Sequence, residues 1–353
     1  MRINSLIGAL ALLPLLLTSC NSSGPEDTGT NATPNPTNNG TMSTLSCKSE
    51  DVLRTGISKG GILDVRVSDG SFYVAGEKNV SRVPMGGGAS EVLITFKDEA
   101  RVAALTTRGV VTIPFTGTVR YTDYAGTPIG EWAFTYTTTT AIYDAANNQL
   151  LLVKVADKIM YDAIDLETQT RRTHEVVDPT GGWASLFAGT RSDDWIARAG
   201  NGAIYLEHEF DDGKISRIAL NTNEITRFVP ELPEAQIKGF ADGATYVWTG
   251  SNRKTEVIEL YRVEASGATQ TVNELHNMRN LTIAIVDGFD GKIYYRLNDG
   301  IYLVTGTNVE RIGTVESECQ RDGFLSVAGQ YYAVSHPTST GTATEKVIMK
   351  LKI

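Results

Sequence analysis

Short runs of apolar, mostly β-branched and aromatic residues, each ended by a polar turn, repeat along most of this chain. The clearest example covers residues 283–315 and reads IAIVDGFDGKIYYRLNDGIYLVTGTNVERIGTV. Its Asp-Gly and Asn-Asp-Gly turns are typical of tightly connected antiparallel strands, and its apolar residues alternate or cluster as they do in strands. This stretch therefore predicts one meander of four antiparallel strands.

The same order of strands and turns recurs seven times. The first-strand segments, each ending in a turn, are residues 63–70, 102–109, 140–148, 194–202, 237–243, 283–291 and 324–329. Successive turns, measured at Asp69, Arg108, Asn147, Asn201, Asp242, Asp290 and Ala328, lie 39, 39, 54, 41, 48 and 38 residues apart. Intervals of about 40 to 50 residues are typical of β-propeller blades, which stack radially because a lone meander cannot bury both faces. The pattern predicts an all-β propeller of seven four-stranded blades, and the 54-residue interval leaves six or eight blades as alternatives.

The last unit lacks a fourth strand, because the sequence stops at Ile353 after the third. An open strand edge of this kind invites aggregation, so a strand from elsewhere is expected to cover it. Residues 49–55, SEDVLRT, resemble the fourth-strand segment SEVLITF at residues 90–96. The N-terminal strand is therefore predicted to complete the seventh blade, and the alternative is a lead-in with an accidental similarity.

The first twenty residues differ from the rest. An apolar run from Leu6 to Leu17 has the length of a signal-peptide core and is too short to span a bilayer. It ends in the tetrapeptide LTSC, residues 17–20, which resembles the lipobox of bacterial lipoproteins. The resemblance implies cleavage before Cys20, acylation of that residue with palmitate-type chains and anchoring in the membrane; the alternative is an ordinary secretory signal. Asn21 after the cysteine further implies sorting to the outer membrane.

Residues 21–46 contain almost no side chain that could enter a core, and they are predicted to form a disordered tether. A flexible coil of this length spans about 28 Å. The propeller is then expected to occupy residues 47–353, held near the membrane without lying on it.

The charge argues against one class of partner, and the cysteine content predicts a disulfide. The chain has 32 basic and 41 acidic residues, and no Lys/Arg cluster stands out, so nucleic acid is not an expected partner. Once Cys20 is lipidated, Cys47 and Cys319 are the remaining cysteines, and in an exported chain they are predicted to form a disulfide. In a simple meander Cys47 would lie at the opposite end of the blade from Cys319, so the lead-in must fold back for the pair to form.

Two phrases resemble known bacterial propellers. VSRVPMGGGASEVL (80–93) and IYLVTGTNVERI (301–312) are similar to the strand, turn, strand units of TolB-like and YWTD-like propellers. YDAIDLETQT (161–170) faintly resembles a pyrroloquinoline-quinone-type repeat, but Gln169 replaces the expected glycine and the other units lack the phrase. The resemblance implies a propeller fold and carries over no cofactor site.

Candidate functional residues lie in the longest loops, residues 178–194, 207–213, 249–256 and 336–345. Long loops in a repeat fold commonly carry function. Trp183, Arg191 and Arg253 are candidate anchors for a partner, because exposed Trp and Arg dominate interface energetics. The alternative for Trp183 is packing against the apolar wall between blades.

Polar candidates gather at one hairpin tip. His208, Glu209, Asp211 and Asp212 are close together there, and His336 stands in another long loop; all five are candidate ligand or partner contacts. Their nitrogen and oxygen atoms suit a divalent cation, yet the spacing matches no metal motif, and acidic residues at such tips are usually solvated turn formers. No serine stands in a Gly-x-Ser-x-Gly elbow. We therefore predict no catalytic residue, metal or cofactor.

Together these features favour a non-catalytic binding or scaffolding lipoprotein of the bacterial cell envelope, whose propeller loops contact a protein or glycan. The alternative is a propeller enzyme, a hydrolase or lyase, that acts on a carbohydrate or small molecule at the mouth of the central channel. Converging acidic and histidine side chains around a deep pocket would favour the enzyme.

Overall fold

The chain divides into two units in the computed structural model, residues 1–38 and residues 39–353. The residues that the structure describes all belong to the second unit, and they are 44–45, 52–58, 60–115, 117–134, 139–155, 158–183, 195–208, 215–232, 235–249, 257–276, 284–297, 300–315, 319–337 and 345–351. Within these ranges, no helix is long and apolar enough to cross a lipid bilayer.

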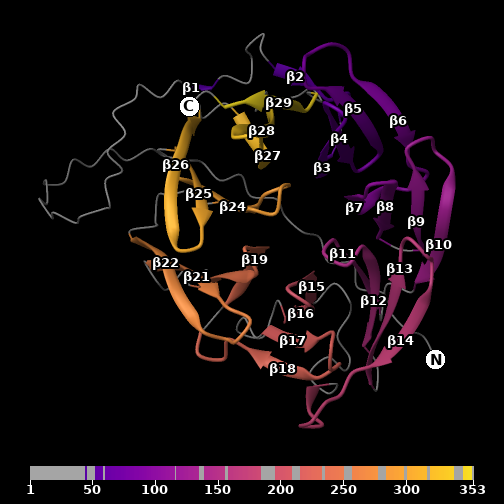
Figure 1. The fold of residues 1–353 in the computed structure, drawn as a ribbon, viewed down its shortest axis with the longest axis vertical. Coiled ribbons are helices and arrows are strands. Elements are labelled where there is room, and N and C mark those ends of the chain that lie inside the picture. Colours follow the sequence, from indigo (N-terminus) through magenta and orange to yellow (C-terminus); the bar gives the residue numbers. More distant parts are fainter. Residues whose placement is uncertain are drawn as a thin grey trace, which may run out of the picture. The chain divides into compact units, whose positions relative to one another are not determined.

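Seven sheets of four antiparallel strands stand around one centre, as Figure 1 shows. In each sheet the first strand lies nearest the centre and the fourth lies at the rim. The fold is a seven-bladed β-propeller, so the predicted fold class and blade number are confirmed, and the alternatives of six or eight blades are wrong.

The blades follow the order of the chain. Blades 1 to 3 are β3 (Ile62–Ser68), β4 (Ser71–Gly76), β5 (Asn79–Pro84) and β6 (Glu91–Thr95); β7 (Ala100–Leu105), β8 (Gly109–Pro114), β9 (Gly117–Asp123) and β10 (Pro128–Phe134); and β11 (Thr139–Asp144), β12 (Gln149–Val155), β13 (Ile159–Asp165) and β14 (Arg171–Glu175). Blades 4 and 5 are β15 (Trp195–Gly200), β16 (Ala203–His208), β17 (Ile215–Ala219) and β18 (Ile225–Phe228); and β19 (Gln236–Ala241), β20 (Ala244–Thr249), β21 (Val257–Val263) and β22 (Thr269–His276). Blade 6 is β23 (Ala284–Asp287), β24 (Ile293–Leu297), β25 (Gly300–Thr305) and β26 (Asn308–Val315), and blade 7 is β27 (Cys319–Val327), β28 (Gln330–Pro337), β29 (Val347–Lys350) and β2 (Val52–Arg54).

Local turn chemistry sets the connection between first and second strands. Asp69 and Asp242 have φ of 49° and 50°, and the glycines that follow them have φ of 67° and 70°. Two consecutive residues with positive φ are what a type I′ hairpin turn needs, and Asp-Gly meets that need with little strain. The predicted turns therefore fix the register of the inner hairpins.

The ring closes through the N-terminal strand. β2 pairs antiparallel with β29, with Val52 opposite Met349 and Arg54 opposite Val347. The side chain of Glu345 adds to this closure, because its Oε1 accepts a hydrogen bond from the Gly56 amide at 2.7 Å. The prediction that an N-terminal strand completes the seventh blade is confirmed.

A further short strand, β1 (Thr44–Leu45), runs parallel to the end of β26, with Leu45 opposite Val315. It makes the sheet of blade 6 five-stranded. The two residues fall inside the segment 21–46 that the sequence assigned to the tether, so the pairing of the chain with the propeller begins earlier than predicted.

Seven apolar clusters fill the seven seams between neighbouring blades. Strand β12 shows why, since Leu151 and Val153 pack toward blade 4 while Leu150 and Leu152 pack toward blade 2. Successive side chains of a strand point to opposite faces, so a sheet buried on both sides needs an unbroken apolar run. The LLLV sequence of β12 is such a run.

Candidate functional site

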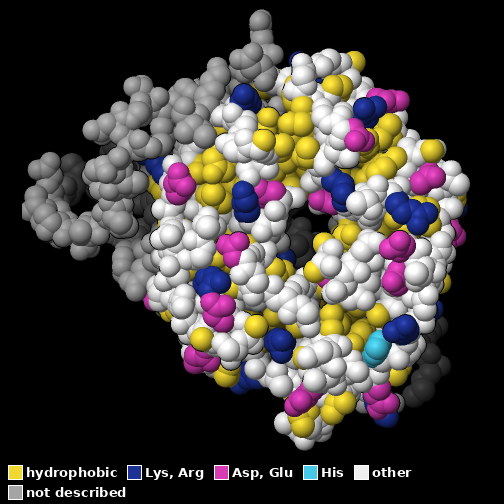
Figure 2. Space-filling view, viewed as in Figure 1, with side chains coloured by type: hydrophobic (Ala, Val, Ile, Leu, Met, Phe, Trp, Pro, Cys, Tyr) yellow, Lys and Arg dark blue, Asp and Glu magenta, His cyan; other side chains and the backbone are white. Residues whose placement is uncertain are grey.

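The first strands enclose a cavity of about 870 Å³ at the centre of the ring. Its walls come from β3, β7, β11, β15, β19 and β27 and from the turn after β23, so all seven blades contribute. Figure 2 shows the hollow at the centre of the ring, with acidic and basic side chains near its rim. We call this cavity the channel.

The two sides of the ring differ in their connections. First strands begin and second strands end on one side, which we call the loop face; the pairs Ala100 with Pro114 and Trp195 with His208 mark it in blades 2 and 4. The tight turns, such as the one at Asp69, lie on the other side. The ends of β16, β20 and β28 therefore lie on the loop face.

Apolar side chains form most of the channel wall. Among the residues that the structure describes, the ionisable ones in this wall are Asp64, Arg66, Tyr143, Arg198 and Asp290. The charge and the pKa values in the channel therefore depend on the hydrogen bonds and ion pairs of these side chains.

Asp64 on β3 joins blade 1 to blade 2. Its Oδ1 accepts a hydrogen bond from the amide of Val65 at 2.8 Å, and its Oδ2 accepts one from the amide of Leu105 on β7 at 2.6 Å. Burial raises the pKa of Asp64 from 3.8 to about 6, although both amide hydrogen bonds and nearby Arg66 act in the opposite direction. The carboxyl is thus a desolvated link between blades.

Asp290, in the turn after β23, joins blade 6 to blade 7. Its Oδ2 accepts hydrogen bonds at 2.9 Å from Tyr294 Oη, from the amide of Ser326 and from Ser326 Oγ. Its Oδ1 is buried with no partner among the described residues, and a Cβ at Gly288 would lie 2.6 Å from it. A side chain at position 288 would also clash with the Tyr294 ring at 2.4 Å and the Lys292 carbonyl oxygen at 2.7 Å, so this turn requires glycine.

Glu207 on β16 plays the same part between blades 4 and 5. Its Oε2 accepts a hydrogen bond from the amide of Ile237 at 3.2 Å, and its Oε1 pairs with Arg198 Nε at 3.1 Å. Burial raises the pKa of Glu207, partly offset by Arg198, and burial lowers the pKa of the neighbouring Lys238. The Lys238 ammonium lies 5.3 Å from the ring centre of Trp248, a cation–π contact beside the same seam.

These three carboxylates each bind a backbone amide of the next blade. Such charge-assisted bonds satisfy amides that would otherwise be buried without partners. The acidic groups in and beside the channel thus hold neighbouring blades together.

The structure places some of the sequence candidates and leaves others outside the described residues. Trp183 is partly buried against the cluster between blades 3 and 4, and its amide donates a hydrogen bond to Asp178 Oδ2 at 2.7 Å. This is the packing position that was the alternative to partner binding. His208 and His336 lie near the ends of β16 and β28 on the loop face, opposite Trp195 and Gln320.

Within the residues that the structure describes, no contact joins the remaining candidate residues. Cys319 opens β27, opposite Pro337. Those that lie outside the described residues are Cys20, Cys47, Arg191, Glu209, Asp211, Asp212 and Arg253. Within the described ranges, no group of three or more His, Cys, Asp or Glu side chains could hold a metal ion.

Sequence reasoning missed the three carboxylates that join blades. Asp290 was seen only as a turn former, and Asp64 and Glu207 were not singled out. The available signal was a charged residue inside an otherwise apolar strand, as in LDVRV and AIYLEH. The role of such a residue depends on a backbone amide of the next blade, about 30 to 40 residues further along the chain, which the strand pattern does not reveal.

Comparisons with known proteins extend this picture only to the fold. No family model and no curated protein matches the chain. Similar solved structures include the extracellular domain of a one-component system from B. thetaiotaomicron (10% identity, TM-score 0.51, 86% of this chain and 40% of that one). The RRP9 WD40 repeats (9%, 0.55, 86% and 98%) and the Cps50 (Swd1) β-propeller domain of Myceliophteria thermophila (12%, 0.54, 85% and 100%) are also similar.

At these identities the likeness shows a β-propeller and no more. The chain spans about 40% of the length of the bacterial extracellular domain. The finer resemblance to TolB-like and YWTD-like propellers, and the lipobox, stay predictions.

Proposed function

We propose that this chain is a lipid-anchored protein of the bacterial cell envelope whose propeller is a non-catalytic binding platform for a protein or glycan partner at the loop face. The observation that carries the binding role is the state of the channel carboxylates. Asp64 and Asp290 both accept amide hydrogen bonds from a neighbouring blade, which favours a rigid ring over a reactive acid–base pair.

The loop face offers a surface for such a partner. Phe115, directly after β8, is 54% exposed, and the Arg101 guanidinium lies 5.8 Å from its ring centre. Val102 and Ile196, near the starts of β7 and β15, are 39% and 40% exposed. Exposed aromatic, arginine and apolar side chains on one side of the ring have the composition of an interface surface.

Envelope anchoring is supported by the sequence at residues 17–20 and by the polar segment 21–46. The B. thetaiotaomicron structure with the same fold is named as an extracellular domain, which fits this location. Outer-membrane sorting is part of the proposal because Asn21 follows the cysteine.

Crosslinking in cells tests the binding platform. The full chain is crosslinked in the envelope and purified, and the proteins and glycans that come with it are identified. A specific partner should be lost from Phe115→Ala and Ile196→Glu variants, because both changes disrupt the loop face, and retained by Val177→Glu. Val177 is a matched control that is 54% exposed near the rim between blades 3 and 4.

A partner that survives both loop-face changes, or recovery of the protein alone, refutes the binding platform. If the purified chain converts many molecules of a small compound per molecule of protein, the enzyme alternative is favoured instead.

Cys20→Ser tests the anchor. The wild type should fractionate with membranes and incorporate labelled palmitate, whereas the variant should do neither. A variant that still fractionates with membranes and takes up label contradicts lipidation at this residue.

A disulfide between Cys47 and Cys319 is also part of the proposal. The pairing of Leu45 with Val315 supports this part of the proposal, because Cys47 follows Leu45 by two residues and Cys319 follows Val315 by four. Peptide mapping without reductant should recover the two cysteines in one linked peptide. Free, alkylatable thiols at both positions in exported protein would exclude the bond.

A further inference from the structure

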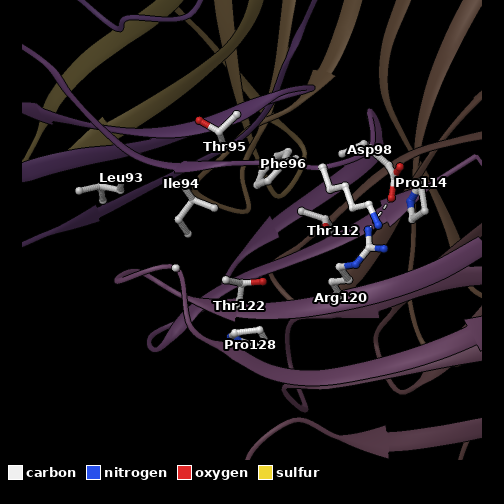
Figure 3. Close-up of a pocket in the computed structure, with 13 residues that line it drawn as sticks. Leu93, Ile94, Thr95, Phe96, Asp98, Thr112, Pro114, Arg120, Thr122 and Pro128 are labelled. Atoms are coloured by element: carbon white, nitrogen blue, oxygen red, sulfur yellow. Dashed lines mark hydrogen bonds and ion pairs between the residues drawn. The ribbon is translucent and has the colours of Figure 1, made fainter.

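The seam between blades 1 and 2 opens at the rim into a pocket that is separate from the channel. The pocket has a volume of about 260 Å³ and lies between residues 93–98 on one side and β8, β9 and the start of β10 on the other, as Figure 3 shows. The inner part of this seam is filled by an apolar cluster, and Ile94 belongs both to that cluster and to the pocket wall. The pocket therefore begins where the apolar filling of the seam ends.

The floor of the pocket is the outer half of the blade 2 sheet. Thr112 stands opposite Arg120 across β8 and β9, and Thr122 stands opposite Pro128 across β9 and β10. Residues at this spacing share one face of a sheet. Two hydroxyls and one guanidinium thus face the same space, and neither hydroxyl has a hydrogen-bond partner among the described residues.

An ion pair lies at one end of this floor. Arg120 Nη1 contacts Asp98 Oδ2 at 2.6 Å, and Arg120 Nε lies 3.3 Å from Glu131 Oε1. The hydrogen bond to Arg120 lowers the pKa of Asp98, and the same bond raises the pKa of Arg120, so the pair is charged over the physiological range. Because a guanidinium has five N–H groups and a carboxylate two oxygens, the pair still presents donors and an acceptor to a ligand.

The net charge of this arrangement disfavours an ionic ligand. The positive charge of Arg120 is already matched by Asp98 and Glu131, and Lys97 is the other cation in the lining. The opposite wall contributes Phe96, with Pro114 beside the ion pair (Figure 3). A ligand that fits has an apolar face, several hydroxyls that both donate and accept, and no charge.

The volume of the pocket also favours a small neutral ligand. Pockets for drug-sized ligands have about 300 to 1,000 Å³. At about 260 Å³ this one suits a single six-membered ring with its substituents. A pyranose has C–H faces that pack on Phe or Pro and vicinal hydroxyls that match an Arg–carboxylate pair.

We propose that the pocket between blades 1 and 2 binds one neutral sugar residue of a glycan. Thr112 and Thr122 bond its hydroxyls, the Asp98 and Arg120 pair bonds a vicinal diol, and Phe96 contacts its apolar face. This site reaches the loop face at Ala100 and Pro114, and it adds a sugar contact to the proposed platform. Phe115 and Ile196, whose variants test the platform, do not line the pocket.

A titration of the mature, non-acylated full chain tests the site. The probes are D-glucose, D-galactose, D-mannose and N-acetyl-D-glucosamine, followed by saturation-transfer NMR. At least one should bind saturably, with a dissociation constant on the order of 1 mM for a ligand of about twelve to fifteen heavy atoms. Arg120→Lys keeps the charge but loses the forked geometry, and it should weaken binding about tenfold or more.

Two further variants complete the design. Thr122→Phe fills the floor and should abolish binding even if Arg120→Lys alters the local fold. Arg171→Lys is the matched control, because Arg171 is also paired with an aspartate, Asp162, but in blade 3. It should bind sugar as the wild type does.

Several results would overturn the proposal. The first two are that none of the four sugars binds saturably, or that Thr122→Phe leaves sugar binding unchanged. The third is that Arg171→Lys weakens sugar binding as much as Arg120→Lys does. The fourth is that D-glucuronate or an extended Thr/Ala peptide binds more tightly than any neutral sugar. Loss of the loop-face partner in cells with intact sugar binding, or the reverse, separates this site from the binding platform.

Discussion

Asp64 offers a sharp test of the channel electrostatics. Its pKa is raised from 3.8 to about 6 in the folded protein, mainly by burial. Because the folded protein binds this proton more tightly than the unfolded chain, the contribution of Asp64 to stability is fully present below pH 3.8 and is lost as pH rises through about 6. At about 1.4 kcal/mol for each pKa unit, the loss amounts to about 3 kcal/mol.

The substitution Asp64→Asn removes this titration. An asparagine side chain has a single acceptor oxygen, so the variant keeps only one of the two bonds from Val65 and Leu105, and that loss does not depend on pH. The free energy of unfolding of wild type and variant is measured by urea denaturation from pH 4 to 7.5. Because part of the change has already occurred at pH 4, the wild type should lose about 2.5 kcal/mol more than the variant over this range.

Other buried groups, such as Glu207, titrate in both proteins and cancel in the difference. Asp69→Asn is the matched control, because it removes the same charge at an exposed turn where asparagine tolerates the positive φ. Its stability curve should run parallel to that of the wild type. If the Asp64→Asn curve also runs parallel, the carboxyl is not desolvated and the reasoning about the channel wall fails.

Three further predictions concern the ring itself. Removal of β2 leaves the edge of β29 unpaired, so a chain that starts at Gly56 should lose thermal stability and aggregate in light scattering, unlike one that starts at Asp51. Leu151→Ala should cost about 2 to 5 kcal/mol in urea denaturation, because the side chain is fully buried between blades 3 and 4, and an equally large effect from exposed Val177→Ala would argue against this. Burial alone would raise the pKa of Asp162, but hydrogen bonds from Arg171 and Thr173 hold it below its usual range, so the wild type should lose more stability than Asp162→Asn as pH falls below about 4. Because Asp162 is buried while its cationic partners Arg171 and Lys154 are partly exposed, Asp162→Asn should also cost about 1.5 to 3 kcal/mol at pH 7 by weakening these bonds, and a cost near zero would show that they add no stability.

Much of the fold follows from local chemistry, and that is why the sequence could predict it. Asp-Gly and Asn-Gly turns are decided by neighbours in the chain, and the meander predicted for residues 283–315 is blade 6, whose strands lie between Ala284 and Val315. The closing strand β2 was predicted because an unpaired edge and a matching segment could both be seen in the sequence.

The candidate site could not be derived in the same way. Asp64 acquires its role from the amide of Leu105, and Arg120 acquires its role from Asp98 across a seam. Such contacts depend on how neighbouring sheets are placed, which no strand pattern encodes. Trp183 was a fair candidate for partner binding from its loop, but its packing against the seam depends on residues from two blades.

The closure of blade 7 has a consequence for how the protein is made. Val52 lies before blade 1 and Met349 lies in the third strand of blade 7, so the pair that seals the ring can form only after blades 1 to 6 have been synthesised. Until then blades 1 to 6 form an open arc whose two ends lack partners, and a chain that stops early keeps an exposed edge for quality-control proteases or aggregation. Closure of this propeller is therefore one of the last steps in its folding, whatever the order in which the single blades form.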